Sequence, residues 1–408
     1  MKPRRVVITG MGMLSPIGNS PERVLASLRE GRSGVRNMPA WNAWKDLHTR
    51  VGATVEGLDE KSIPRESRRS MGRVALLAAA AAEQALAHAR VDRELLRSGR
   101  AGISVGQTVG SPLATEMFFE TMRTEGVRAL KSTTFLQLMS HSAAANLALM
   151  FKVTGRVWAP AAACASSSQA IGQSYETIRD GYQDLMLCGG SEELHVTTAA
   201  TFDILGGTSR AFNESPSSTP RPFDRRRDGL VVGEGAGIIV LEELSHALKR
   251  GVPILGEVLG FATHCDAEHM SAPARSGMAR TMAACLESAG MRASDVDYIN
   301  AHATGTPLGD ATEAQATGDV VGGDIPISST KGFTGHTLAA CGALEVAFSV
   351  LMMNNGFIAP TLNLDDLDPA CEGLRHVREL EERPVRRVLS NNFAFGGVNT
   401  SLLLGLPS

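Results

Sequence analysis

The 408-residue sequence predicts an α/β protein built from two similar halves. Short apolar runs rich in β-branched residues are bounded by glycine, and they alternate with alanine-rich helical patterns, which is typical of buried strands between helices. The length suits two or three domains or one large duplicated fold. With 43% hydrophobic and 20% charged residues, the composition is that of an ordinary globular protein.

The individual elements follow from these runs. The expected strands are 5–9, 102–105, 185–188, 237–241, 256–261, 298–301 and 388–390. The expected helices are 21–29, 73–89, 140–150, 168–179, 277–289 and 339–353. Residues 38–70 and 107–139 break the alternation, so we expect them to be loops that cover a site.

A repeated order of elements indicates the duplication. An apolar stretch, a turn, a helix and a strand surround Cys164, and the same order surrounds His336, with Phe357-Ile-Ala as the returning strand. The expected halves are residues 1–250 and 251–408. No low-complexity linker separates them, so they should pack as one body.

Charge and cysteine usage exclude several function classes. The net charge of −3 gives no overall attraction to nucleic acid or anionic membranes. The six cysteines form no CxxC pair, which argues against a zinc site or a disulfide framework and favours reduced thiols. The chain passes directly into a strand pattern, and its longest apolar stretch, residues 74–82, is too short to span a bilayer. We therefore expect a cytoplasmic protein.

Cys164 is the strongest candidate for a chemical role. It lies in Ala161-Ala-Ala-Cys-Ala-Ser-Ser-Ser168, where small residues permit a sharp turn and substrate access. A helix beginning there would direct free N–H groups at the thiol and favour the thiolate. A single cysteine is more often a small buried hydrophobic residue. Two further turns downstream favour the nucleophile.

Those turns carry histidine and lysine. His302 lies in Asn300-Ala-His-Ala-Thr-Gly-Thr-Pro-Leu-Gly-Asp310, and Lys331 and His336 lie in Ser329-Thr-Lys-Gly-Phe-Thr-Gly-His336. A thiolate can hold an acyl group while two imidazole N–H donors stabilise an enolate oxygen, which suits carbon–carbon bond formation on a thioester. This chemistry needs no cofactor. The alternative, zinc held by Cys164, His302 and His336, lacks metal-type spacing.

Three other motifs are discounted. Thr9-Gly-Met-Gly-Met-Leu-Ser15 imitates a dinucleotide fingerprint but lacks its third glycine and an acidic partner. Gly233-Glu-Gly-Ala-Gly237 lacks the Lys-Ser/Thr of a phosphate loop, and close backbone packing explains it better. His264-Cys-Asp-Ala-Glu-His269 matches no metal spacing and is interpreted as a polar loop. In contrast, Ser390-Asn-Asn-Phe-Ala-Phe-Gly-Gly-Val-Asn399 is either a packed turn or a mobile gate.

The turns together resemble the elongating β-ketoacyl-acyl-carrier-protein synthases of the thiolase superfamily. The motifs are Ala-Cys-Ala-Ser-Ser at Cys164, His-Ala-Thr-Gly-Thr-Pro at His302, Lys-Gly-Phe-Thr-Gly-His at Lys331, and Phe-Ala-Phe-Gly-Gly at Phe393. Arg221-Pro-Phe-Asp extends the resemblance to nearly the whole chain. Two short segments are closer to the type I than to the type II branch.

This resemblance implies a thiolase-like duplicated fold, a five-layered αβαβα sandwich, and a decarboxylative Claisen condensation between an acyl chain and malonyl-acyl carrier protein. It assigns the acyl nucleophile to Cys164 and the malonyl-binding donors to His302 and His336. The remaining roles are electrostatic organisation by Lys331 supported by Glu345 and Asp310, an oxyanion hole and gate at Phe395 and Phe393, and pantetheine binding by Thr304 and Thr306. The family also implies a homodimer, or else a heterodimer with a partner subunit.

Further implied roles concern specificity. Val109 matches a position at the floor of the acyl pocket, and Arg69, Arg128 and Lys131 match positions that dock the acidic carrier protein. Relatives can carry a structural cation near Asn300, Glu345, Ser390 and Asn391, although we expect no metal here. Ala303 and Ala394 replace glycines that are usual in the family. A Cβ at position 394 restricts the backbone of the gate.

Several alternatives stay open. A degradative thiolase needs a second reactive cysteine, which Cys371 does not resemble, and an initiating synthase lacks the lysine turn of His336. A noncatalytic chain-length subunit would lack Cys164, and a nicotinamide oxidoreductase would rest on Gly10 and Gly12 alone. Elongation in fatty-acid synthesis and a specialised polyene or polyketide pathway use the same chemistry.

Overall fold

The strands form two groups that follow the two parts of the chain. The first part supplies β1 (Val6–Leu14), β4 (Ala101–Gly106), β5 (Val157–Trp158), β6 (Leu185–Glu192) and β7 (Gly235–Glu243). The second supplies β8 (Gly256–Cys265), β9 (Tyr298–Asn300), β10 (Pro326–Ser328), β12 (Arg375–His376), β14 (Arg387–Ala394) and β15 (Val398–Gly405). The computed structural model describes residues 3–407. Its strand order is β12-β10-β9-β14-β15-β8-β1-β7-β6-β4-β5, and short β1–β8 pairing joins the two groups.

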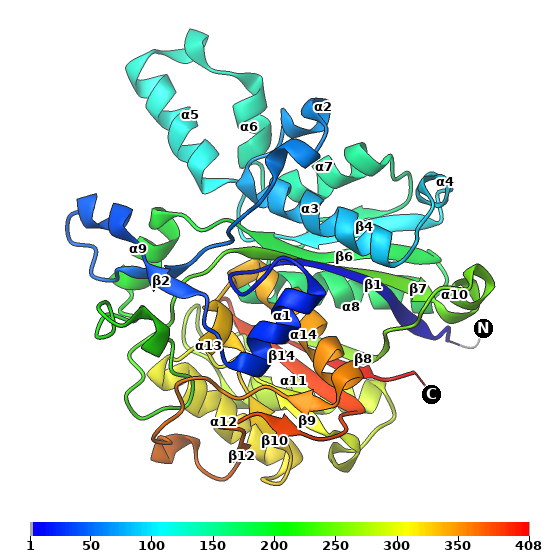
Figure 1. Ribbon diagram of the computed structural model, residues 1–408, viewed down its shortest axis with the longest axis vertical. Coiled ribbons are helices and arrows are strands. Elements are labelled where there is room, and N and C mark those ends of the chain that lie inside the picture. The colour runs from blue at the N-terminus through cyan, green and yellow to red at the C-terminus, as the bar shows by residue number, and fades with distance from the viewer. Residues whose placement is uncertain (1–2, 408) are drawn as a thin grey trace.

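Helices complete five layers (Figure 1). α8 (Ser166–Arg179) and α14 (Cys341–Asn355) lie in the middle, and each contacts strands of both groups. α3 (Arg73–His88) and α7 (Ser142–Phe151) cover the outer face of the first group. α11 (Arg275–Ser288) covers the second group, with α12 (Pro307–Val321) packed against it. The predicted αβαβα sandwich is confirmed.

The helix that follows the second buried turn, α14, lies in a long apolar segment. The segment Leu338–Asn355 is long and apolar enough to cross a membrane by length and composition, but 89% of it is buried inside the protein. Residues 74–82 are an unbroken apolar run, whereas Leu338–Asn355 is longer and apolar on average but is interrupted by Glu345. Sheets on both faces of α14 explain why its apolar residues do not form a single stripe.

Every strand and helix named from the sequence is present, and most ends are shifted by only a few residues. Several strands, among them β1, β6 and β14, extend beyond their predicted ends. The loop predicted at 107–139 is wrong, because it contains two helices that project from the body, α5 (Pro112–Thr124) and α6 (Ser132–Leu138). The other unpredicted helices are α2 (Arg65–Arg68), α4 (Arg93–Leu96), α9 (Val196–Ile204), α10 (Leu244–Arg250) and α13 (Lys331–Thr334), while α1 (Pro21–Glu30) was expected.

The repeat holds for the strand, turn and helix but not for the returning strand. Phe357–Ile358 forms β11, which pairs with β13 (Glu381–Glu382) outside the large sheet, as β2 (Val35–Asn37) pairs with β3 (Val51–Ala53). β14 holds the place that β6 holds in the first group. α10 ends at Arg250 and β8 begins at Gly256, and a division between residues 250 and 251 stays a prediction.

Close packing accounts for the glycines of the discarded dinucleotide motif. A Cβ on Gly12 would lie 2.0 Å from the Ala81 carbonyl oxygen of α3. Glycine therefore lets β1 and α3 approach each other, as the layered core requires.

Candidate active site

Cys164 lies in a strained turn at the start of α8. Ala163 has φ +46° and opens a 3₁₀ turn, Ala163–Ala165, that leads directly into the helix. Ser166 fixes this turn, because its Oγ donates to Ala163 O (2.7 Å) and accepts from Ala162 N (2.9 Å). A positive φ is costly for alanine, which makes this conformation a marker of a functional site.

The thiol opens into a cavity of about 370 Å³. His302, His336, Thr304 and Thr306 line the same cavity. Both predicted gate residues, Phe393 and Phe395, also line it, as does Ala394 between them. The structure thus brings together residues from four separate turns.

The three catalytic candidates are in contact or nearly so. His336 Nε2 lies 2.8 Å from Cys164 Sγ. The His302 and His336 rings meet edge to face with centroids 5.2 Å apart. Asn392 Nδ2 lies 3.5 Å from His302 Nδ1 and can donate to it, which places the imidazole proton on Nε2. Asn392 was not assigned a role from the sequence.

Two buried carboxylates hold the loop that carries His302. Glu313 accepts from the backbone N–H groups of His302 (2.8 Å) and Ala303 (2.6 Å). Asp310 accepts from those of Thr304 (3.0 Å) and Gly305 (3.1 Å). Burial raises the pKa of Glu313 to about 8 and that of Asp310 to about 6, although these hydrogen bonds lower both values. Sequence reasoning found Asp310 but missed Glu313.

Lys331 lies behind the two histidines in a buried ion pair. Its Nζ lies 2.5 Å from Glu345 Oε1, and Asn392 Nδ2 donates to Glu345 Oε2 (2.7 Å). Burial of the ammonium opposes its charge, but the carboxylate of Glu345 raises the pKa of Lys331. Lys331 and Glu345 are in direct contact, and their electrostatic role at the site stays a prediction.

Burial sets the protonation of the reactive groups. It lowers the pKa of His302 and of His336 well below the ordinary value, and the charge of Lys331 adds to this effect. Both imidazoles are therefore neutral, as expected. Burial also raises the pKa of the Cys164 thiol to about 12, against the opposing charge of Lys331. This direction runs against the expected thiolate, because burial disfavours the charged form more than the charge of Lys331 favours it.

The gate residues differ in burial. Phe393 is buried with its ring 6.2 Å from that of His302, whereas Phe395 is partly exposed and packs on Phe202 at 5.6 Å. Ala394 is the last residue of β14 and pairs with Val398, so its backbone is extended here.

The specificity residues lie away from the cavity. Val109 is 50% exposed and is not part of the cavity lining. Arg69, Arg128 and Lys131 are exposed, and none forms an ion pair with another residue in the described range 3–407. Their roles in acyl selection and carrier docking stay predictions.

Two groups of side chains could hold a cation. The sulfur of Cys164 and ring nitrogens of His302 and His336 lie within 4.8 Å of one another. Asn300 Oδ1 and Ser390 Oγ are buried without a hydrogen-bond partner among the described residues, so these oxygens fit the cation position implied by the resemblance. The absence of a metal stays a prediction.

Known proteins of one enzyme family are similar to this chain over most of its length. The family models "Beta-ketoacyl synthase, N-terminal domain" and "Beta-ketoacyl synthase, C-terminal domain" match residues 3–247 and 255–365. The chain is 38% identical over 403 residues, 98% of each chain, to 3-oxoacyl-[acyl-carrier-protein] synthase 1 of Haemophilus influenzae.

Two solved structures have the same fold. A beta-ketoacyl synthase from Burkholderia phymatum superposes with a TM-score of 0.96 at 45% identity, covering 99% of this chain and all of that one. A type II polyketide synthase ketosynthase, solved in complex with its acyl-carrier protein and bound to a hexaketide, gives 0.91 at 29% identity, covering all of both chains.

Proposed function

The chain belongs to the beta-ketoacyl synthase family, and on this premise we propose that it condenses an acyl chain on Cys164 with malonyl-acyl carrier protein to give 3-oxoacyl-acyl carrier protein. The observation that carries the proposal is the contact of 2.8 Å between Cys164 Sγ and His336 Nε2, with His302 beside it in one cavity. The two gating aromatics and Lys331 complete the set.

The first half-reaction loads the acyl chain. Cys164 holds its proton at rest because of its raised pKa, and His336 Nε2 lies 2.8 Å from the sulfur, where its N–H can stabilise the sulfur as the thiol proton departs to the leaving thiolate. The sulfur then attacks the thioester carbonyl of the acyl carrier. The carrier's thiolate leaves and takes up the proton. Backbone N–H groups of Cys164 and Phe395 are proposed to stabilise the oxyanion.

The second half-reaction makes the carbon–carbon bond. Malonyl thioester loses CO₂, and the electron pair of the broken bond forms an enolate whose oxygen accepts hydrogen bonds from His302 and His336. Neutral imidazoles with one N–H each suit this role, and Asn392 orients the proton of His302. The enolate carbon attacks the acyl carbonyl on Cys164, and the carbon–sulfur bond breaks to release the thiolate, which takes up a proton from water to restore the resting thiol.

Partners and pathway belong to the same proposal. An acyl carrier protein delivers both substrates, and the exposed cations Arg69, Arg128 and Lys131 would attract its acidic surface. We propose a homodimer working in fatty-acid elongation in the cytoplasm. A specialised polyketide pathway is the second candidate, supported by the similarity to the polyketide ketosynthase.

The test supplies purified protein with a panel of acyl-carrier thioesters and malonyl-carrier protein. The proposal predicts a 3-oxoacyl product two carbons longer and one CO₂ released per turnover, unchanged by a metal chelator. Absence of product with every acyl carrier would contradict it. Activity lost on chelation would favour the zinc site instead. A preference for polyketide over saturated acyl chains would favour the specialised pathway.

A further inference from the structure

One segment, residues 221–233, touches the loops of both catalytic histidines, and we name it the brace. It contains the Arg221-Pro-Phe-Asp motif and Arg227. At one end, Gly229 N donates to Gly305 O (3.0 Å) in the loop of His302. At the other end, His336 N donates to Val231 O (2.7 Å) and Gly233 N donates to His336 O (2.9 Å). The brace therefore ties two loops that are distant in the sequence.

Arg227 is the centre of the end that faces His302. Its side chain is 3% exposed. Its guanidinium donates to the carbonyl oxygens of Thr306 (3.3 Å) and Pro307 (2.8 Å), where α12 begins. Its Nε also lies 3.8 Å from Asp310 Oδ2, the carboxylate that holds Thr304 N and Gly305 N. Arg227 thus contacts both the loop of His302 and the residue that fixes it.

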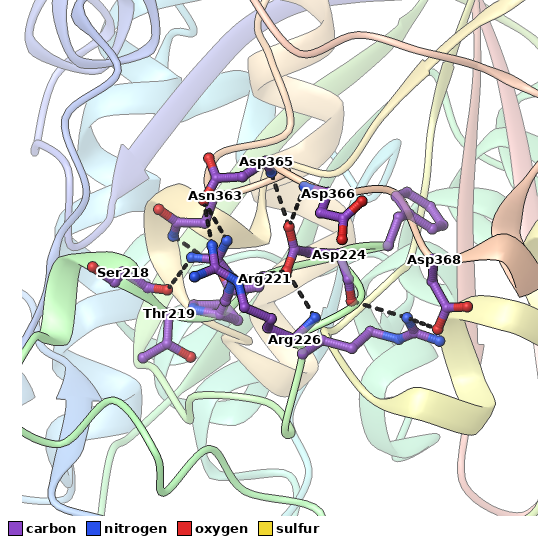
Figure 2. Close-up of polar contacts among 12 residues, drawn as sticks. Ser218, Thr219, Arg221, Asp224, Arg226, Asn363, Asp365, Asp366 and Asp368 are labelled. Carbon is purple, nitrogen blue, oxygen red and sulfur yellow. Dashed lines mark hydrogen bonds and ion pairs between the residues drawn. The ribbon is translucent and has the colours of Figure 1, made fainter.

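A network of acidic residues holds Arg227 from the other side. Arg227 Nη1 donates to Asp368 Oδ2 (2.5 Å) and to Asp224 O (3.0 Å). Figure 2 shows Asp224 between Arg221 and the backbone of Asp365 and Asp366, from which it accepts hydrogen bonds of 2.8–3.0 Å. The buried guanidinium of Arg227 has few alternative positions, because it donates four hydrogen bonds to acceptors on both of its sides.

The turn of Cys164 does not share these contacts. Among the described residues, no hydrogen bond joins the brace to residues 162–166, and Ser166 and Ala162 fix that turn locally. The turn of Cys164 is therefore not hydrogen-bonded to the brace, although Leu230 and Val232 of the brace pack in the same apolar cluster as Cys164.

We propose that Arg227 is a positioning residue for the condensation step, acting through Asp310 and the start of α12 to set the position of His302. It touches no reacting atom. The proposal rests on the proposed function and assigns to Arg227 a share in the second half-reaction only. Loss of Arg227 leaves the backbone bonds of His336 intact but frees the loop that bears His302. Thr304 and Thr306 lie in the same loop, so binding of either carrier can weaken in both half-reactions, and the rates at saturating carrier isolate the role of His302.

The experiment compares Arg227→Gln with Arg225→Gln, a matched control in the same segment whose arginine side chain is 66% exposed. Acyl transfer to Cys164 is followed in a single turnover by intact mass, and condensation by release of 3-oxoacyl carrier. At saturating carrier we expect Arg227→Gln to acylate at the wild-type rate while condensation falls about 100-fold in kcat, as misplacement by about 1 Å can cause. Arg225→Gln should match wild type in both.

Equal losses of acylation and condensation, or no loss of either, would overturn the proposal. Arg227→Lys keeps the charge toward Asp310 and Asp368 but has no planar fork for two carbonyls, so condensation should recover in part. If Arg227→Gln does not fold, Asp368→Asn removes a single charged contact of Arg227 and must show the same asymmetry, or the proposal fails. A wild-type protein that never condenses refutes the proposed function, whereas a condensing wild type without the asymmetry refutes only the role of Arg227.

Discussion

The two helices of the middle layer begin with the same strained turn, yet only one turn carries a nucleophile. Ala163 has φ +46° before α8, and Leu338 has φ +47° before α14. Each opens a 3₁₀ turn that leads directly into its helix. The residue that follows is Cys164 in the first turn and Ala339 in the second.

The surroundings of the two turns differ as much as the residues do. Cys164 opens into the substrate cavity, whereas the backbone N–H of Ala339 donates to Glu192 Oε2 (3.2 Å), and that carboxylate is buried. A helix N-terminus attracts anions, so in the second turn a carboxylate of the protein takes the place that is open to substrate in the first. The comparison teaches that the fold repeats the geometry of the turn. The Cys164 side chain gives the first turn its chemistry, and the Glu192 carboxylate occupies the corresponding place at the second.

The largest expected effect is a difference in reaction rates between variants of the two histidines beside the first turn. His302→Asn should lower the condensation rate by about 10²- to 10⁴-fold, because one enolate donor is lost, while Cys164 still acquires its acyl group. His336→Asn should slow both steps, because His336, unlike His302, has a ring nitrogen at hydrogen-bond distance from the sulfur among the described residues. Rapid-quench mass spectrometry measures each step. Identical profiles for the two variants would contradict the division of roles.

The next effect concerns the contact between α8 and α14, the two helices that follow these turns. A Cβ on Gly342 of α14 would lie 2.0 Å from Ser168 Oγ of α8 and 2.6 Å from Asn392 Oδ1. Gly342→Ala should therefore lower the free energy of unfolding by about 1–3 kcal/mol. Gly318→Ala on α12, where the nearest atom is 3.9 Å away, should raise it by about 0.5–1 kcal/mol. Chemical denaturation of both variants checks this, and equal shifts would contradict it.

A smaller effect is the pH dependence of the thiol in the first turn. Burial raises the pKa of Cys164 to about 12, so the thiolate fraction grows about tenfold per pH unit below that value. The rate of Cys164 alkylation by iodoacetamide should thus rise steadily from pH 7 to 9. A plateau below pH 8 would mean that the helix N-terminus outweighs burial.

The smallest effect links the two turns electrostatically. Burial raises the pKa of Glu192 to about 7, and its negative charge contributes to the raised pKa of Cys164. Glu192→Gln removes this charge, so alkylation should be a few-fold faster than wild type above pH 7 and unchanged at pH 6, where Glu192 is largely protonated. Slower alkylation at every pH would show that the carboxylate serves only to hold Ala339.

The sequence allowed much of this site to be predicted because its chemistry is concentrated in local motifs. Cys164, His302 and Lys331 each stand in a turn of small residues that few structural roles require. Glu313 and Asn392 carry no such signal, since their importance arises only when α12 and β14 are placed against the turns. The raised pKa of Cys164 could not be predicted for the same reason, because burial of the thiol depends on the whole fold.

The fold errors also have physical causes. Phe357–Ile358 was expected to be the returning strand of the repeat but pairs with β13 instead, because a short apolar run does not specify which strand it joins. The helices at 112–124 and 132–138 expose Phe119 and Phe135, so they lack the usual apolar stripe facing a core. Ser111, whose side chain accepts from Ala114 N, and Pro112 at the first helical position were a start signal that could have revealed the first of them.

Peptide mapping of the acylated protein tests the central claim most directly. After incubation with an acyl-carrier thioester, tandem mass spectrometry should place one acyl group on Cys164, and added malonyl-carrier protein should remove it. Cys164→Ala should acquire no acyl group, whereas Cys265→Ala, which changes an exposed cysteine, should behave as wild type. An acyl group found on another residue, or one that persists on Cys164 after malonyl-carrier protein is added, would contradict the account.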